Sequence, residues 1–166
     1  MPNTDVTLYT DGSSHNLGEG IYQKAGIGIH SSDLNITIGL YLGDGISSNC
    51  CEYEAIIAAM KIAVNRGVSR LTIKSDSELC VKQILKNCLG RPGYACSDKK
   101  LIPRLEIVKE LIDEFKFFNI VHIRRGLNSE ADDAADKAVK DKKIIAIPSS
   151  WTTKYVTFQL DKDQMK

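Results

Sequence analysis

The segment VTLYTDGSS, residues 6–14, is the starting point for assigning an architecture to this chain. Val6, Leu8 and Thr10 alternate with Thr7, Tyr9 and Asp11, which is the period-two pattern of a β-strand, and a Gly-Ser-Ser turn signal follows. The pattern therefore predicts a strand over residues 6–11 that ends at Asp11.

The rest of the chain continues with strands and then alternates helices with strands. Two β-rich runs, residues 25–30 and 36–42, flank a polar turn and predict an antiparallel hairpin. We expect helices over residues 49–66, 78–86, 101–115 and 129–142, strands over residues 71–76 and 120–124, and an irregular segment over residues 87–98. The first, fourth and fifth strands are joined by helical crossovers and should be parallel. The order predicts an α/β fold with a five-stranded mixed sheet flanked by helices.

Composition limits the class of protein. The 166 residues are 43% hydrophobic and 26% charged, which favours one compact domain, and the net charge of +1 gives no general attraction to polyanions. No run approaches the roughly 20 apolar residues of a membrane span, so we expect no membrane partner. The five cysteines are odd in number and lack CxxC spacing, which indicates reduced thiols. Without a signal-like N-terminus, we expect a non-secreted protein in the cytoplasm or another reducing compartment.

Four acidic residues from distant segments are candidates for one site. Asp11 and Asp76 end two strands that we expect to be neighbours, at the edge where α/β sheets bind ligands. Glu52 lies on the apolar face of its helix, and Asp132 in the first turn of the last helix can point to the same edge. Carboxylates packed together repel, and oxygen ligands without His or Cys select Mg²⁺ or Mn²⁺. We therefore expect a metal site.

Each acid also has a structural explanation when it is taken alone. Asp11 with the following glycine is a common turn dipeptide, and Asn49 with Glu52 matches a capping box. Asp76 could cap the next helix, and Asp132 could complement a helix dipole. Separate structural roles do not explain why all four acids lie in segments that we expect at the same edge of the sheet.

The residues around these acids resemble four signature segments of type 1 ribonuclease H. The segments are Tyr9-Thr10-Asp11-Gly12-Ser13, Asn49-Cys50-Cys51-Glu52-Tyr53-Glu54-Ala55, Ser75-Asp76-Ser77-Glu78-Leu79 and Asn128-Ser129-Glu130-Ala131-Asp132. The resemblance implies a ribonuclease H-like fold with strand order 3-2-1-4-5. It implies endonucleolytic cleavage of the RNA strand of RNA–DNA hybrids, with 5′-phosphate and 3′-hydroxyl products.

The same resemblance assigns site residues. Asp11, Glu52, Asp76 and Asp132 would be catalytic and would hold two Mg²⁺ ions, with Mn²⁺ as the alternative metal. Positions that contact the sugar-phosphate backbone in the family correspond to the substrate-binding candidates Gly12, Ser13, Ser14, Asn49 and Ser77. Gly12 would let the backbone approach the substrate closely.

The chain departs from the family in the connection before Asp132, in its basic segment and in residues 144–166, which nothing in the family matches well. The connection before Asp132 lacks the mobile histidine of many members and resembles the shorter archaeal-like branch, while His122 is expected to be a partly buried structural residue. The basic segment over residues 87–104 is too short for the family's basic handle, so it is either a reduced substrate loop or a solvated face. We expect residues 1–142 to form the domain and residues 143–166 a C-terminal extension that packs on it or mediates contacts; a monomer is the default.

Three rival functions remain. A 3′-5′ exonuclease is disfavoured because Ser13 stands where the glutamate of an Asp-x-Glu pattern is expected. A retroelement-derived ribonuclease H fragment would share every motif. A non-catalytic hybrid-binding or scaffold domain would keep the fold, although intact acids argue against it.

Overall fold

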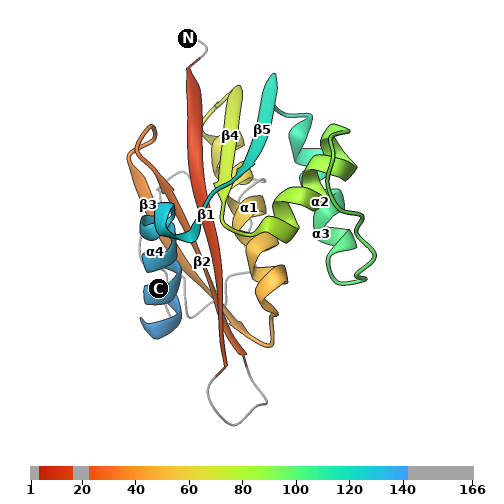
Figure 1. The fold of residues 1–166 in the computed structure, drawn as a ribbon. Helices are drawn as coiled ribbons and strands as arrows, with labels where there is room; N and C mark the ends of the chain where they lie inside the picture. Colours follow the sequence, from red (N-terminus) through yellow and green to blue (C-terminus); the bar gives the residue numbers. More distant parts are fainter. Residues whose placement is uncertain (1–3, 17–22, 142–166) are drawn as a thin grey trace.

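A computed structural model of the chain describes residues 4–16 and 23–141, which form one mixed sheet and its flanking helices (Figure 1). The extension expected over residues 143–166 lies outside the described residues. The strands are β1 (Asp5–Asn16), β2 (Gln23–Ser31), β3 (Ile36–Asp44), β4 (Arg70–Ser75) and β5 (Phe117–His122). The helices are α1 (Ser48–Asn65), α2 (Glu78–Leu89), α3 (Ile102–Ile112), the short 3₁₀ helix η1 (Arg125–Leu127) and α4 (Ser129–Asp141).

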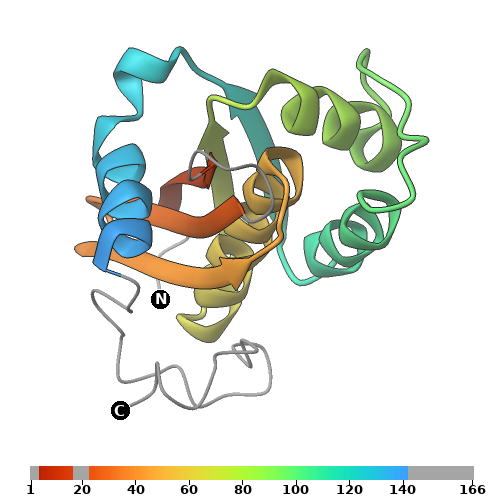
Figure 2. The ribbon, with the colours of Figure 1, turned by 90° about the horizontal axis from the view of Figure 1, so that it is seen from below.

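The sheet has the order β3-β2-β1-β4-β5, as predicted. β1, β2 and β3 pair antiparallel, whereas β4 pairs parallel with both β1 and β5. Figure 2, which views the molecule from below, shows α1 and α4 on opposite sides of the sheet, with α2 and α3 beyond α1. The sheet is therefore the middle layer of three, and α4 packs on β1, β2 and β3.

β1 is longer than the sequence pattern indicated. Its parallel pairing with β4 ends at Thr10 opposite Ser75, but its antiparallel pairing with β2 continues to Asn16 opposite Gln23. The expected end at Asp11 is therefore wrong for the strand. Asp11 is instead the first residue of β1 after the pairing with β4 ends. The sequence pattern located this point because it reports side-chain burial and not backbone pairing.

Several other boundaries differ from those expected. α1 begins at Ser48, and the Ser47 side chain caps it by accepting from the Cys50 N–H group, so the capping box built on Asn49 is wrong. α2 continues to Leu89, where Gly90 takes the left-handed conformation, φ 62°, that ends the helix. β5 starts at Phe117 and ends at His122, earlier than its pattern suggested.

Two glycines on β2 set the distance between the sheet and α4. A Cβ atom added at Gly28 would lie 1.9 Å from the Ala131 carbonyl oxygen, and one at Gly26 would lie 2.9 Å from that of Ala135. The alanine side chains of α4 on this face are small and buried. The glycine and alanine pairing therefore lets the helix backbone rest almost directly on the strand.

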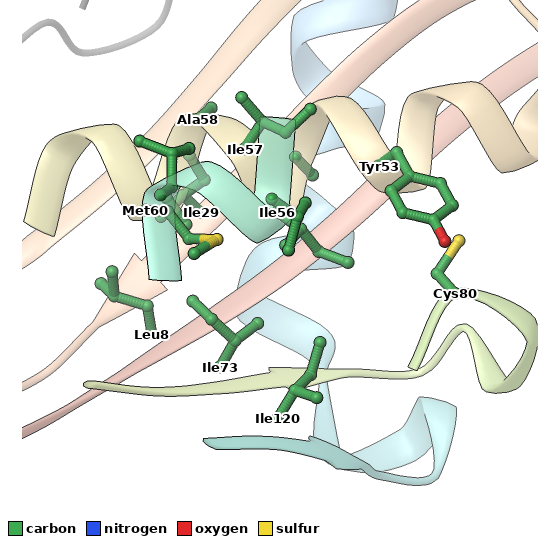
Figure 3. Packing of buried hydrophobic residues seen from close by; sticks show 14 of the residues in the cluster. Leu8, Ile29, Tyr53, Ile56, Ile57, Ala58, Met60, Ile73, Cys80 and Ile120 are labelled. Atoms are coloured by element: carbon green, nitrogen blue, oxygen red, sulfur yellow. The ribbon is translucent and has the colours of Figure 1, made fainter. Parts of the chain in front are cut away.

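The main core lies between the sheet and α1 (Figure 3). Leu8, Ile73 and Ile56 are fully buried there, and each buried aliphatic side chain of this size contributes roughly 1.5–3 kcal/mol. Tyr53 is also fully buried, and its hydroxyl donates to the Gln83 side chain at 2.7 Å. This core fixes the strands that carry Asp11 and Asp76.

All five cysteines are free thiols, as expected. Among the described residues, no helix has both the length and the apolar character needed to cross a bilayer.

Candidate metal centre

Three of the four predicted acids meet at the end of the β1 and β4 pairing. Asp11, Glu52 and Asp76 each place a carboxylate oxygen within 4.8 Å of the oxygens offered by the other two. Asp11 comes from β1, Glu52 from the first turns of α1, and Asp76 from the residue after β4. The structure thus brings together residues that are up to 65 positions apart in the sequence.

Glu52 is held in place by backbone and side-chain donors. Its carboxylate accepts a hydrogen bond from the Gly12 N–H group at 2.8 Å and another from the Ser75 hydroxyl at 3.4 Å. A Cβ atom at Gly12 would lie 2.4 Å from the Glu52 nitrogen, so only glycine permits this approach. The lack of a side chain at Gly12 therefore lets β1 approach the backbone of α1, and this approach holds Glu52 against β1. The expected close approach of Gly12 to a substrate stays a prediction.

Asp132 reaches the same place from the opposite layer. It lies outside the group of three, on the part of α4 that rests on β2, and it is near enough to Asp11 to contribute to the raised pKa of that carboxyl group. The Asn128 side chain is fully buried and donates to the Thr10 carbonyl at 2.8 Å, and the backbone carbonyl of Asn128 accepts from the Asp132 N–H group. Asn128 therefore fixes the start of α4 relative to β1.

Burial and neighbouring carboxylates raise the pKa values of Asp11 and Glu52. Burial, with Glu52, Asp76 and Asp132 nearby, raises the pKa of Asp11 from 3.8 to about 10. Burial also raises the pKa of Glu52 to about 7, although the hydrogen bond from Gly12 opposes the shift. Without a cation, protonated Asp11 can donate to its neighbours and relieve part of the repulsion.

The donor set fits a hard divalent cation. Asp11 and Glu52 are only 4% and 8% exposed, and the buried Oδ2 atom of Asp76 has no hydrogen-bond partner. Buried polar atoms normally have partners, so this oxygen is one that a cation would satisfy. Carboxylate oxygens without His or Cys are typical ligands of Mg²⁺ and Mn²⁺.

A cleft of about 330 Å³ opens over the acids. Its lining contains all four acids together with three substrate-binding candidates, Gly12, Ser13 and Ser14. Asn49 and Ser77 are not in this lining. Asn49 is exposed and its carbonyl accepts from the Cys80 thiol, whereas the Ser77 hydroxyl caps α2.

Three lining residues were not among the sequence candidates: Ser48, Arg125 and Asp136. Asp136 could have been found because it follows Asp132 by four residues and shares its helix face. Arg125 lies 3.8 Å from the Asp132 carboxylate and is 81% exposed, so its contact is a loose one.

The structure describes two of the segments in which the sequence departs from the family. His122 is exposed, contrary to expectation, because it is the last residue of an edge strand. In the basic segment, Arg91 donates to the Asn119 side chain and Arg104 to Glu54, both at 2.9 Å. These two hydrogen bonds tie the segment to β5 and α1, and its role as a reduced substrate loop or a solvated face stays a prediction.

The comparisons with known proteins agree with this geometry. A family model described as reverse transcriptase-like matches residues 31–138, and the chain belongs to that family. Ribonuclease HI of Halobacterium salinarum is 30% identical over 95 residues, which are 57% of this chain and 45% of the relative. The match thus spans less than half of that relative's length.

Solved structures extend the similarity. The crystal structure of ribonuclease H1 from Halobacterium salinarum has a TM-score of 0.72 at 27% identity and covers 83% of this chain and 99% of its own. LC11-RNase H1, isolated from compost by a metagenomic approach and solved with an RNA/DNA hybrid, gives 0.66 at 24% identity, with 82% and 98% covered. The resemblance to type 1 ribonuclease H is confirmed.

Proposed function

We propose that this chain is a metal-dependent endoribonuclease that hydrolyses the RNA strand of RNA–DNA hybrids. The observation that carries the proposal is the meeting of Asp11, Glu52 and Asp76 within 4.8 Å, in a cleft that also contains Asp132. The similarity to type 1 ribonucleases H, one of which is solved with an RNA/DNA hybrid, supports the choice of substrate.

The four acids would hold two Mg²⁺ ions, with Mn²⁺ as the alternative. When bound, such ions neutralise the carboxylates and supply Lewis-acid chemistry at a phosphodiester. Asp11, Glu52 and Asp76 would supply the closely spaced ligand oxygens, and Asp132 would add a carboxylate from the other wall of the cleft. Hydrolysis by water would leave 5′-phosphate and 3′-hydroxyl ends.

The protein's own contribution is to hold these oxygens in place. The Gly12 N–H group and the Ser75 hydroxyl orient Glu52, and Asn128 orients the helix that carries Asp132. These supports are on strands and helices of the rigid core, so the ligand geometry exists before substrate arrives.

The test is cleavage of an end-labelled RNA–DNA hybrid in Mg²⁺ and in Mn²⁺. Single-stranded RNA, duplex RNA and duplex DNA serve as substrate controls. Asp76→Asn removes one ligand charge at nearly constant shape, and Asp113→Asn makes the same change at an exposed position at the end of α3.

We expect RNA-strand cleavage confined to the hybrid, lost in Asp76→Asn and retained in Asp113→Asn. A folded wild-type protein that cuts nothing in either metal would refute the proposal. Hybrid binding without cutting would indicate the scaffold function instead.

A further inference from the structure

The sheet is covered unevenly on the side that faces α4. The helix packs on β1, β2 and β3, and Figure 1 shows it at their side of the sheet, away from β4 and β5. On β4 and β5, the side chains that alternate with the buried ones point to this side and are exposed or half-buried. We name this surface the open half-face; it consists of Arg70, Thr72, Lys74, Phe117, Asn119 and Val121. None of these residues lines the acidic cleft.

Two cations of the open half-face are held by aromatic rings. Parallel pairing places Arg70 beside Phe117, and the guanidinium carbon lies 4.7 Å from the centre of that ring. Further along β4, the Lys74 ammonium lies 5.6 Å from the ring centre of Tyr9 on the neighbouring strand β1. Cation–π contacts of this kind orient the charged groups at the surface without neutralising them.

The open half-face carries positive charge. It contains no acidic residue, and Arg91, from the segment after α2, adds a third cation by donating to the Asn119 side chain at 2.9 Å. Asp5 pairs with Arg70 at 2.6 Å, whereas the ion pairs between described residues give Lys74 no acidic partner. A positive surface on a chain whose net charge is only +1 is a local feature that fits an anionic partner.

We propose that the open half-face binds a single strand of nucleic acid. Phosphates pair with the cations Arg70, Lys74 and Arg91. Unpaired bases stack on the exposed Phe117 ring and on the guanidinium plane of Arg70. An acidic protein segment would use the charges but not these stacking surfaces, and the bases of a duplex offer no free faces. The inference does not rest on the proposed function, because the surface lies outside the cleft.

The test is fluorescence anisotropy of a labelled oligothymidine of about 12 nucleotides, titrated with the full chain in EDTA. Without a metal ion, the carboxylates of the cleft repel phosphates, so the cleft contributes little to binding. Duplex DNA of the same length and an oligoglutamate peptide are the comparison ligands. We expect the single strand to bind more tightly than either of them.

Four variants separate the effects of charge and stacking. Lys74→Gln removes one phosphate contact, so we expect roughly three- to tenfold weaker binding at low salt and a salt slope reduced by about 0.7. Phe117→Ala removes a stacking surface and should weaken binding by roughly fivefold or more, with the slope unchanged. Asp5→Asn removes the acid beside Arg70 and should tighten binding by about two- to threefold. Lys109→Gln makes the same charge change at an exposed position of α3 and should have no effect.

Three results would overturn the proposal. Equal or tighter binding of the oligoglutamate peptide would point to an acidic protein partner, and equal or tighter binding of the duplex would exclude stacking of unpaired bases. Equal weakening by Lys74→Gln and Lys109→Gln would show that the charge effect is not local. Asp5→Asn keeps the test decisive if another variant fails to fold, because misfolding does not tighten binding. Hybrid cleavage in Mg²⁺ is measured separately, so failure here leaves the proposed function intact.

Discussion

Two neighbouring regions of the same strands differ sharply in what they contribute. Leu8 on β1 and Ile73 on β4 are completely buried against α1 in an apolar environment. Three residues further along the chain from each of them, Asp11 on β1 and Asp76 just after β4 lie close together among other carboxylates. The apolar core stabilises the fold with or without a metal ion. The ionised carboxylates of the acid cluster lower the stability of the fold unless a cation is present. The arrangement suggests that the fold's stability supports a site that is destabilising when empty.

The largest expected effect comes from Asp11→Asn, which separates activity from stability. Losing a shared ligand should lower hybrid cleavage by about 10³-fold or more, equivalent to about 4 kcal/mol. The same change removes repulsion, so the metal-free variant should be more stable than the wild type at pH 8. Cleavage kinetics and urea unfolding in EDTA measure the two effects. A variant that is both inactive and less stable would contradict this view of the cluster.

Leu8→Ala should do the reverse on the other side of the comparison. Removing a fully buried side chain should lower the free energy of unfolding by about 3 kcal/mol. Cleavage per folded molecule should change little, because no ligand is altered. Urea unfolding and active-site titration check the two predictions. A large loss of activity in the fully folded fraction would show that core and site are coupled more tightly than proposed.

Gly28→Ala tests the contact that joins α4 to the sheet. The new methyl group would lie 1.9 Å from the Ala131 carbonyl oxygen, so α4 must move and carry Asp132 with it. We expect about 2 kcal/mol of destabilisation together with weaker Mg²⁺ binding. Gly126→Ala, where the added Cβ would meet nothing within 4 Å, is the control and should be neutral. Calorimetric Mg²⁺ titration and thermal unfolding provide the measurements.

The pH dependence of the metal-free protein tests the acid cluster without any substitution. The pKa of Asp11 is raised from 3.8 to about 10 and that of Glu52 from 4.5 to about 7. Between these limits the folded state binds more protons than the unfolded state, so stability falls as pH rises. Each group that stays protonated only in the folded state lowers stability by about 1.4 kcal/mol per pH unit, so we expect a loss of several kcal/mol between pH 5 and pH 8. A stability that rises over this range would contradict the raised pKa values.

Much of this arrangement could be predicted from the sequence, because local patterns report burial. The alternation over residues 6–11 and 71–76 located both strands, and the apolar stripe of residues 49–66 placed Glu52 on the inner face. Asp11 and Asp76 could be grouped because parallel strands end at one edge, and Asp132 because the first turn of its helix follows the last strand.

Other features depend on tertiary contacts that no local pattern shows. The continuation of β1 to Asn16 depends on pairing with β2, and the role of Gly12 depends on the backbone of α1. The bond between Ser13 and Asp136 joins residues 123 positions apart. The exposure of His122 follows from its place on an edge strand, which its own sequence does not reveal.

The most direct measurement is the free energy of unfolding at pH 8 as a function of Mg²⁺ concentration, for the wild type and Asp11→Asn. Mg²⁺ at five times its dissociation constant should stabilise the wild type by about 1 kcal/mol. The same concentration should have a much smaller effect on Asp11→Asn, which starts from a higher stability in EDTA. Equal stabilisation of both proteins, or none of the wild type, would contradict the assignment of this acid cluster as a metal centre.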